Sequence, residues 1–340
     1  MTTLITADTH LTDHPRDGHR WDLFPWLAKK AKKYKCDQVL ILGDLTDAKD
    51  RHSSSLVNRV VRALRSVAEV CPVFVLKGNH DFIDERQPFF GFLEDIPGLT
   101  FITEPLVTEL RINDVASDLV LFVPAQRKWS DALGDYDFTS FNYIFTHQTY
   151  NGAVTETGHV LEGVPAAVFN KCAAKIWSGD IHVPQRIGKR IEYVGAPYRI
   201  RFGDDYTPRV VLLAGGEERN LFFPTTEKHL VVVESVAELK AFGVQIAEGS
   251  QVKVRVKLSP SQFTDWRIMR EEIEKLAAEF GWHLFGPELV AKEQPSTASR
   301  PRLKQKRRSS EDVVRDFAEA QGVDDVLLAA GLGILDGAWG

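Results

Sequence analysis

Short apolar runs alternate with helical patterns along the first two-thirds of the chain, and this alternation restricts the fold more than any other feature. The runs predicted to be strands are Thr3–Ala7, Gln38–Leu42, Pro72–Leu76, Leu119–Pro124, Tyr143–Thr146 and Ala174–Ser178. Apolar residues at helical spacing fill Trp21–Lys33 and Ser54–Val70 between them. Strands that alternate with helices in this way predict a layered α/β fold.

The pattern changes toward the C-terminus. Arg186–Val194 and Arg209–Phe223 have the alternation of β-hairpins, the second turning at Gly215-Gly216. Beyond Pro224, a β-α-β-α unit is predicted from Leu230–Glu234, Val236–Phe242, Gln251–Leu258 and Gln262–Phe280. We therefore expect a large domain over residues 1–225 and a small domain over residues 226–290.

The last fifty residues have a different composition. Residues 291–310 are rich in Lys, Arg, Pro and Ser and predict a basic linker. Ser310-Glu311-Asp312 could cap a final helix over Val313–Gln321, so residues 311–340 predict a helical tail.

Bulk composition excludes some classes of protein. The formal net charge of −5 gives no global basic field, although local basic stripes matter more for nucleic-acid binding. The three cysteines are widely spaced, which suits a reducing compartment. We see no signal-peptide pattern and no run of about 18 apolar residues, so the prediction is a cytoplasmic protein without membrane association.

Five polar motifs follow predicted strands, where α/β sheets place their chemistry. They are Asp8-Thr9-His10, Gly43-Asp44-Leu45-Thr46-Asp47, Gly78-Asn79-His80-Asp81, His147 and Gly179-Asp180-Ile181-His182. Each alone has an ordinary explanation, such as a capping Asp, a turn or a hydrogen-bonded core histidine. Their occurrence in this order after successive strands predicts one shared site.

The residue types in these motifs suit two divalent cations. Such a pair needs a bridging carboxylate, further oxygen ligands and a few imidazoles. The motifs contain no thiolate, which argues against a closed structural zinc site. We expect two divalent ions, with Mn²⁺ preferred and Mg²⁺, Fe or open-site Zn²⁺ as alternatives.

In order, spacing and context, the five motifs resemble the calcineurin-like metallophosphoesterase superfamily. Within it, the chain is similar to the SbcD-type nuclease subunit of DNA double-strand-break repair. That similarity includes Gly195-Ala196-Pro197-Tyr198-Arg199, Phe202-Gly203-Asp204 and the His-x-Pro-Gln that ends at Gln185. The resemblance implies an α/β/β/α sandwich, a small α+β capping domain that binds DNA, and a C-terminal helical tail.

The resemblance also implies roles for single residues. Asp8, His10 and His182 would hold one metal, and Asp44 would bridge to the second. Asn79, His147 and Asp180 would complete that second site, with His80 beside the scissile phosphate as the catalytic group. Asp47 and Asp81 would orient ligands or cap loops.

Position 180 departs from the superfamily pattern, which has His where this chain has Asp180. A third carboxylate would leave a net charge near +1 on two cations instead of +2, and we expect a preference for harder metals such as Mn²⁺. Tight stoichiometric zinc would count against this hypothesis. Alternatively, Asp180 is not a ligand and water takes the place.

For function, the resemblance implies a 3′-to-5′ DNA exonuclease and single-strand endonuclease. The tail would bind an SMC-like coiled-coil ATPase of the SbcC type, and a homodimer is compatible with the apolar positions of Ser54–Val70. DNA-backbone contacts are expected from Arg51, His52, Arg199 and Arg201. The alternatives are a phosphoesterase for a small phosphoester, cyclic nucleotide or phosphoprotein, and a non-catalytic DNA-binding subunit.

Overall fold

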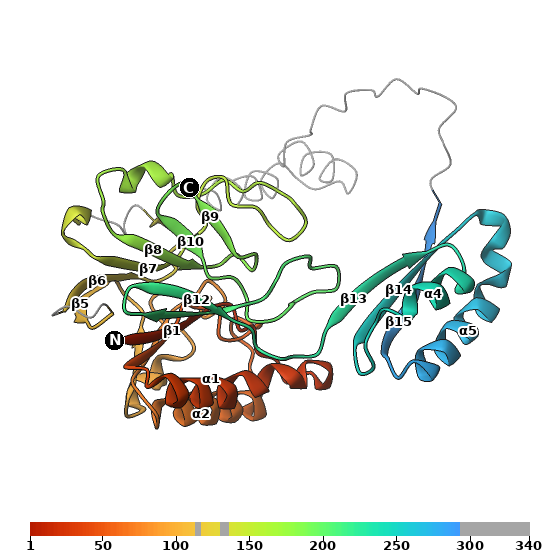
Figure 1. Cartoon of the computed structure of the whole chain (residues 1–340), viewed down its shortest axis with the longest axis horizontal. Coiled ribbons are helices and arrows are strands. Elements are labelled where there is room, and N and C mark those ends of the chain that lie inside the picture. The colour runs from red at the N-terminus through yellow and green to blue at the C-terminus, as the bar shows by residue number, and fades with distance from the viewer. Residues whose placement is uncertain (113–116, 130–135, 293–340) are drawn as a thin grey trace, which may run out of the picture. The chain divides into compact units, whose positions relative to one another are not determined.

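Two six-stranded sheets form the main body of the protein in the computed structural model, which describes residues 1–112, 117–129 and 136–292 (Figure 1). The first sheet has the order β12-β11-β1-β2-β3-β4. Its strands are β1 (Thr2–Thr6), β2 (Gln38–Ile41), β3 (Val73–Leu76), β4 (Leu99–Ile102), β11 (Val210–Ala214) and β12 (Glu217–Leu221). Because β1 to β4 are parallel, their carboxyl ends meet at one edge of the sheet.

The second sheet has the order β5-β6-β7-β8-β10-β9. Its strands are β5 (Leu106–Leu110), β6 (Asp118–Val123), β7 (Tyr143–His147), β8 (Lys175–Gly179), β9 (Gln185–Ile187) and β10 (Ile191–Tyr193). β6, β7, β8 and β10 are parallel, whereas the edge strands β5 and β9 pair antiparallel to their neighbours. The second sheet therefore has its own edge of carboxyl ends.

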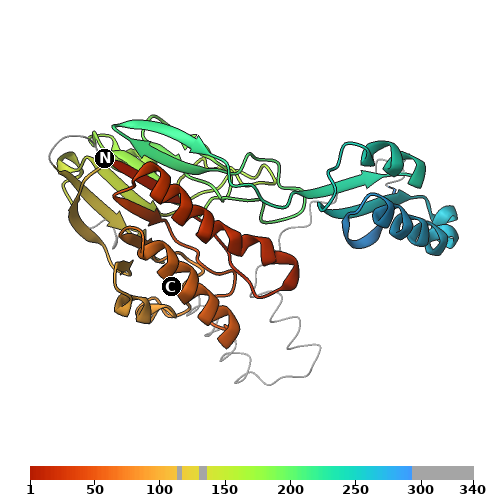
Figure 2. The ribbon, with the colours of Figure 1, turned by 60° about the horizontal axis from the view of Figure 1, so that its bottom comes forward.

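Alternation within single strands builds the layers. Ile5 of β1 packs between the two sheets with Phe122 and Trp177, whereas Leu4 faces the opposite side. On that side lie α1 (Leu23–Tyr34) and α2 (Ser54–Ala68), which run side by side over the first sheet (Figure 2). The 3₁₀ helix η1 (Pro15–Asp22) leads into α1, so the predicted helix Trp21–Lys33 starts with tighter turns.

The outer face of the second sheet has its own apolar cluster, which includes Ile144, Ile176 and Phe169. The described segments over it are η3 (Phe138–Ser140), η4 (Ala166–Phe169) and the loops around them. A further 3₁₀ helix, η2 (Gly91–Asp95), precedes β4. The layered α/β fold predicted from the sequence is confirmed.

A third sheet of three parallel strands, β13-β14-β15, follows the second hairpin. Its elements are β13 (Lys228–Val233), α4 (Val236–Gly243), β14 (Gln251–Leu258), η5 (Pro260–Asp265), α5 (Trp266–Glu279) and β15 (His283–Ala291). They enclose a separate apolar core that contains Leu239, Val254 and Ile273. The predicted β-α-β-α unit thus has a third strand, β15, that the sequence analysis lacked.

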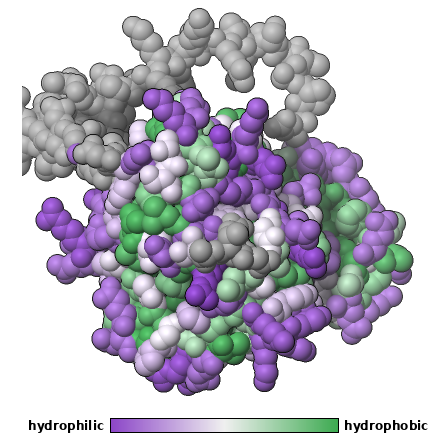
Figure 3. Space-filling model, turned by 60° about the vertical axis from the view of Figure 1, so that its left-hand side comes forward, coloured by the Kyte–Doolittle hydropathy of each residue, from purple (hydrophilic) through white to green (hydrophobic). Residues whose placement is uncertain are grey.

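The predicted linker and tail, residues 291–340, lie almost entirely outside the described residues and stay predictions. The molecular face shown in Figure 3 is mainly polar, with separate small apolar patches. Among the described residues, no helix has the length and apolarity needed to cross a bilayer.

Candidate metal centre

The motif loops of both sheets converge on one buried point. The side chains of Asp8, Asp44 and His147 place one ligand atom each within 4.8 Å of one another, and all three are buried. Among the described residues, five that are not glycine have a positive φ, and four of these belong to the motifs: Asp8 (53°), His10 (38°), Asp44 (54°) and Asp180 (85°). Left-handed backbone is costly for such residues, and its concentration here indicates a functional site.

Close approach of the loops depends on glycine. A Cβ on Gly43 would lie 2.2 Å from His147 Nδ1, and a Cβ on Gly78 would lie 2.2 Å from both the backbone nitrogen and Oδ1 of Asp44. Gly43 also has a φ of 88°. These two positions exclude any side chain and so bring the β2, β3 and β7 loops into contact.

Asp44 lies between two groups of predicted ligands. Its Oδ2 is 3.4 Å from His10 Nε2, and its Oδ1 is 3.4 Å from His147 Nε2. The two oxygens of one carboxylate therefore face opposite halves of the site. A bridging ligand of two cations needs this orientation.

The imidazoles of the site have defined free nitrogens. His147 Nδ1 donates to the carbonyl of Leu42 at 2.7 Å, which leaves Nε2 as the nitrogen that faces Asp44 and could bind a cation. His10 and His182 face each other with their Nε2 atoms 3.1 Å apart. Two imidazole nitrogens pointing at one place suit a shared cation.

Asn79 and Asp180 form the other half of the site. Asn79 Nδ2 donates to Asp180 Oδ1 at 3.3 Å, and this directs the amide oxygen of Asn79 away from Asp180. Asp180 Oδ1 is also 3.9 Å from His147 Nε2. The second oxygen of Asp180 accepts a hydrogen bond from the hydroxyl of Thr149, a residue that no sequence motif indicated.

The described residues of this cluster do not satisfy all of its buried polar atoms or balance its carboxylate charge. Asp8 Oδ2, Asn79 Oδ1, His147 Nε2 and His182 Nδ1 are buried atoms without a hydrogen-bond partner among the described residues. Burial and the neighbouring Asp44 carboxylate raise the pKa of Asp8 to about 7. Although burial opposes it, the Asp44 and Asp8 carboxylates raise the pKa of His147 to about 9. Carboxylates packed this closely need positive charge.

Divalent cations fit this donor set. The partnerless atoms include a carboxylate oxygen, an amide oxygen and imidazole nitrogens, and the cluster has no thiolate. Asp8, His10, His182 and Asp44 would hold one ion. Asp44, Asn79, His147 and Asp180 would hold the other. The structure thus brings together all seven predicted ligands.

Two further acids support the ligand loops. Asp81 is fully buried and accepts backbone N–H bonds from Gly78 at 2.7 Å and from Asp44 and Leu45 at 3.0 Å each. It therefore caps the Asp44 loop and fixes the position of Asp44 at the same time. Asp47 Oδ1 lies 3.4 Å from His10 Nδ1 and so orients the imidazole, whose Nε2 faces Asp44.

His80 lies at the rim of the cluster. Its backbone N–H donates to Asp44 Oδ1 at 2.8 Å, and its ring is 4.8 Å from the His10 ring. The Nδ1 of His80 donates to the carbonyl of Asp47 at 2.7 Å, so Nε2 is the free nitrogen. His80 is only half-buried, so part of this residue is open to solvent at the rim of the cluster.

The candidate DNA contacts lie outside the ligand cluster. Arg51 is exposed just before α2, and the His52 ring packs 4.0 Å from the Phe89 ring. The guanidinium of Arg199 donates to the carbonyl of Lys228 at 3.3 Å, and that of Arg201 pairs with Glu156 at 3.2 Å. His52 has a packing role that the sequence analysis did not foresee.

The arrangement as a whole is typical of a two-cation hydrolase. The sequence profile of the calcineurin-like phosphoesterases matches residues 1–184, which include every predicted ligand. The chain belongs to this family and is a metal-dependent phosphoesterase, as the sequence predicted.

The chain is similar to a viral protein and to a bacterial nuclease of known structure. The chain is 24% identical over 221 residues to "Putative phosphoesterase 244L" of Invertebrate iridescent virus 6, which covers 63% of this chain and 76% of the relative. Among solved structures, it is similar to the nuclease MPE of Pseudomonas putida, with a TM-score of 0.33 and 16% identity over 64% of this chain and 87% of that one.

Proposed function

We propose that this protein is a two-metal DNA nuclease that cleaves phosphodiester bonds, with 3′-to-5′ exonuclease and single-strand endonuclease activity. The observation that carries the hydrolytic part is the position of Asp44, whose two oxygens face His10 and His147 at 3.4 Å each. Support for DNA as the substrate comes from the resemblance of the Gly195–Arg199 and Phe202–Asp204 segments to SbcD-type nucleases.

The geometry of the site indicates what its side chains would do in the reaction. When bound, two divalent cations supply Lewis acidity at the phosphate and activate water near neutral pH. The oriented carboxylates and imidazoles would hold that charge where the motif loops of the two sheets converge. His80 offers Nε2 toward the substrate, because its Nδ1 is engaged by Asp47. We infer that His80 stabilises the developing charge or protonates the leaving oxygen.

We further propose Mn²⁺ as the preferred metal and Asp180 as a ligand. Asp180 Oδ1 faces both Asn79 and His147, whereas its other oxygen is held by Thr149. A carboxylate oxygen in place of an imidazole favours a harder ion. Residues 226–290 remain our candidate for a DNA-capping domain. Residues 311–340, beyond the described part of the chain, remain our candidate for docking an SMC-like ATPase.

The test is a Mn²⁺-dependent cleavage assay on circular single-stranded DNA and end-labelled duplex. His80→Ala should lower kcat by about 100- to 10,000-fold, the range for loss of a positioned acid or base. It should still bind two metal equivalents, measured by elemental analysis. His159→Ala, a change at an exposed histidine outside the cluster, is the matched control. Hydrolysis of a small phosphoester by a wild type that leaves DNA intact would refute the nuclease proposal.

A further inference from the structure

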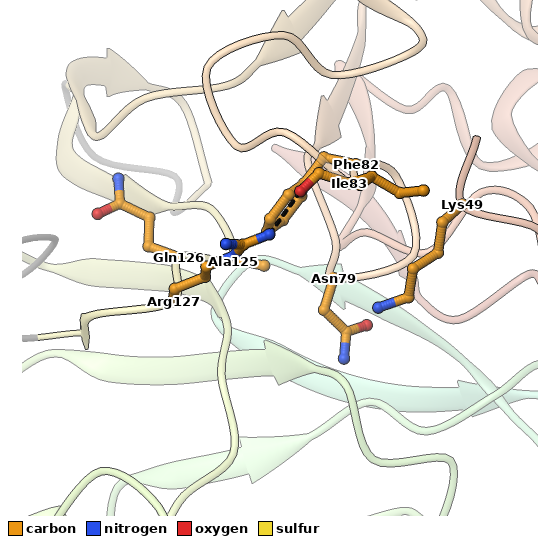
Figure 4. Close-up of a pocket in the computed structure, with 7 residues that line it drawn as sticks. All are labelled: Lys49, Asn79, Phe82, Ile83, Ala125, Gln126 and Arg127. Atoms are coloured by element: carbon orange, nitrogen blue, oxygen red, sulfur yellow. Dashed lines mark hydrogen bonds between the residues drawn. The ribbon is translucent and has the colours of Figure 1, made fainter. Parts of the chain in front are cut away.

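A cavity opens directly beside the predicted ligand Asn79 (Figure 4). Its volume is about 260 Å³, and it is lined by Lys49, Asn79, Phe82, Ile83, Ala125, Gln126 and Arg127. These residues come from the loops after β2, β3 and β6. Pockets for drug-sized ligands measure about 300–1,000 Å³, so this cavity has room for one small unit of a larger substrate.

One wall of the cavity is apolar and firmly supported. Ile83 is 52% exposed, so its side chain is open to contact with a ligand in the cavity. Behind it, Phe82 is buried, and the ammonium of the fully buried Lys77 lies 4.9 Å from the Phe82 ring centroid. The Lys77 Nζ also donates to the carbonyl of Glu85 at 3.1 Å, which fixes this support in place.

Two cations flank the same cavity. Arg127 donates through its guanidinium to the carbonyl of Ile83 at 2.6 Å, and its backbone N–H donates to Glu85 Oε1 at 3.0 Å (Figure 4). Lys49 is exposed on the other side of Asn79. Among the described residues, no carboxylate oxygen lies within 4.0 Å of either charged group. Both cations are therefore available to an anion.

We propose that this cavity binds the nucleotide unit next to the scissile phosphate. Its base or sugar would contact Ile83, and its outer phosphate would lie between Lys49 and Arg127. An apolar surface combined with free cations matches the alternation of flat base and anionic phosphate along a single DNA strand. This inference rests on the proposed nuclease function and names the part of the site that recognises the substrate beyond the metals.

The test compares two substrates. Oligothymidylate has a nucleotide to fill the cavity, whereas bis(p-nitrophenyl) phosphate has none. For the Lys49→Gln/Arg127→Gln double variant, the ratio of kcat/KM on oligothymidylate to kcat/KM on bis(p-nitrophenyl) phosphate should fall at least about tenfold. The slope of log KM for oligothymidylate against log salt should also flatten by about 1 to 2, because two cations that contact the outer phosphate are lost.

The second part of the test is a variant that should bind DNA more tightly, because a misfolded protein cannot show tighter binding. Ile83→Tyr adds a ring for base stacking and should lower the KM for oligothymidylate about threefold or more. Lys189→Gln, in the turn between β9 and β10, is the matched control and should leave the substrate ratio unchanged. If the wild type cuts DNA while the double variant keeps its ratio within twofold and Ile83→Tyr keeps its KM, the cavity is not this subsite. A wild type that hydrolyses only the small ester would instead overturn the nuclease function itself.

Discussion

Two buried clusters of charged residues lie close together in this protein. In one, carboxylates lie next to one another, and in the other, a carboxylate lies between cations. In the metal centre, Asp8, Asp44 and Asp180 crowd together, and several polar atoms have no partner. In the second cluster, Asp17 lies between two cations: its Oδ1 is 3.0 Å from Arg20 and 3.4 Å from the ammonium of Lys228. All three residues of that second cluster are at most 4% exposed.

In the second cluster, the charged groups of Arg20 and Lys228 find most of their partners within the protein. Arg20 also donates to the carbonyls of His10 and Ile200, and Lys228 donates to the Ile200 carbonyl at 2.9 Å. It therefore ties the loop of one metal ligand to the first residue of β13. Burial of charge alone does not distinguish a functional site from a structural one. Left-handed backbone does: of these two clusters only the metal centre has it, whereas both contain like charges and a buried atom without a partner, which is Arg20 Nε in the second cluster.

The largest expected effect separates the two clusters by activity. Asp44→Asn keeps the shape of the side chain and tolerates a φ of 54°, but it removes the bridging charge. Hydrolysis should fall at least about 1,000-fold, since metal-based charge stabilisation contributes several kcal/mol. Although burial opposes it, His147 and His10 lower the pKa of the Asp44 carboxyl, so the metal-free variant should unfold at a lower urea concentration than the wild type.

The matched control is Asp204→Asn, at a buried aspartate that accepts backbone N–H bonds from Ile200 at 2.9 Å and Arg201 at 2.8 Å. It should lose stability and keep its metal stoichiometry. Full activity of Asp44→Asn would contradict the bridging role.

The next effect is on stability. Asp17→Asn leaves Arg20 and Lys228 buried together without a counter-charge, and breaking a buried pair in this way costs about 3–5 kcal/mol. Urea unfolding of the metal-free protein should show that loss, while elemental analysis still finds two metal equivalents. A variant that is fully stable but binds no metal would reverse our assignment of the two clusters.

The sequence predicted the motif residues of the metal centre but not the contacts of the second cluster, and the reason is physical. Ligands such as Asp44 directly follow strands whose apolar pattern is strong, so strand ends alone located them. Thr149 is separated from Asp180 by 31 positions and belongs to no motif. The charges of Lys228 and Asp17 are 211 positions apart. Contacts of this kind depend on how distant loops fold together, which local pattern does not encode.

The same limit applies to the fold. The central strands were found because both of their faces are buried. β5 was missed because it is an edge strand with a half-exposed pattern. β15 contains Gly286-Pro287, which interrupts the apolar run, and its pairing with β14 shifts register between Lys253 and Arg255.

A smaller effect should distinguish positioning from ligation inside the metal centre. Thr149→Val removes the hydroxyl that holds one oxygen of Asp180 and preserves the side-chain volume. Loss of such a supporting hydrogen bond weakens metal affinity about 10- to 100-fold. Calorimetric titration with Mn²⁺ should show one weakened site and one unchanged site. Thr100→Val, at an exposed position of β4, should bind both ions like the wild type, and two unchanged sites in Thr149→Val would exclude the positioning role.

The smallest effect concerns pH and arises beside the second cluster. Burial, together with the nearby Lys228 and Arg20 charges, lowers the pKa of His19 to about 4, despite the opposing Asp17 carboxylate. The unfolded chain takes up a proton on this histidine near pH 6.5, whereas the folded protein does not until about pH 4. The free energy of unfolding should therefore decrease as the pH falls from 6.5 to 4.

His19→Gln should remove that part of the pH dependence, which we expect to be on the order of 1–2 kcal/mol. Urea unfolding of metal-free protein at pH 6.5 and pH 5 measures it, with His14→Gln, at an exposed histidine of the same segment, as the control. An equal slope in wild type and His19→Gln would mean that neither burial nor the cations of the second cluster lower the pKa of His19. The metal centre cannot supply this slope, because burial raises the pKa of Asp8 and of Asp180, and such carboxyls make the metal-free fold more stable as the pH falls.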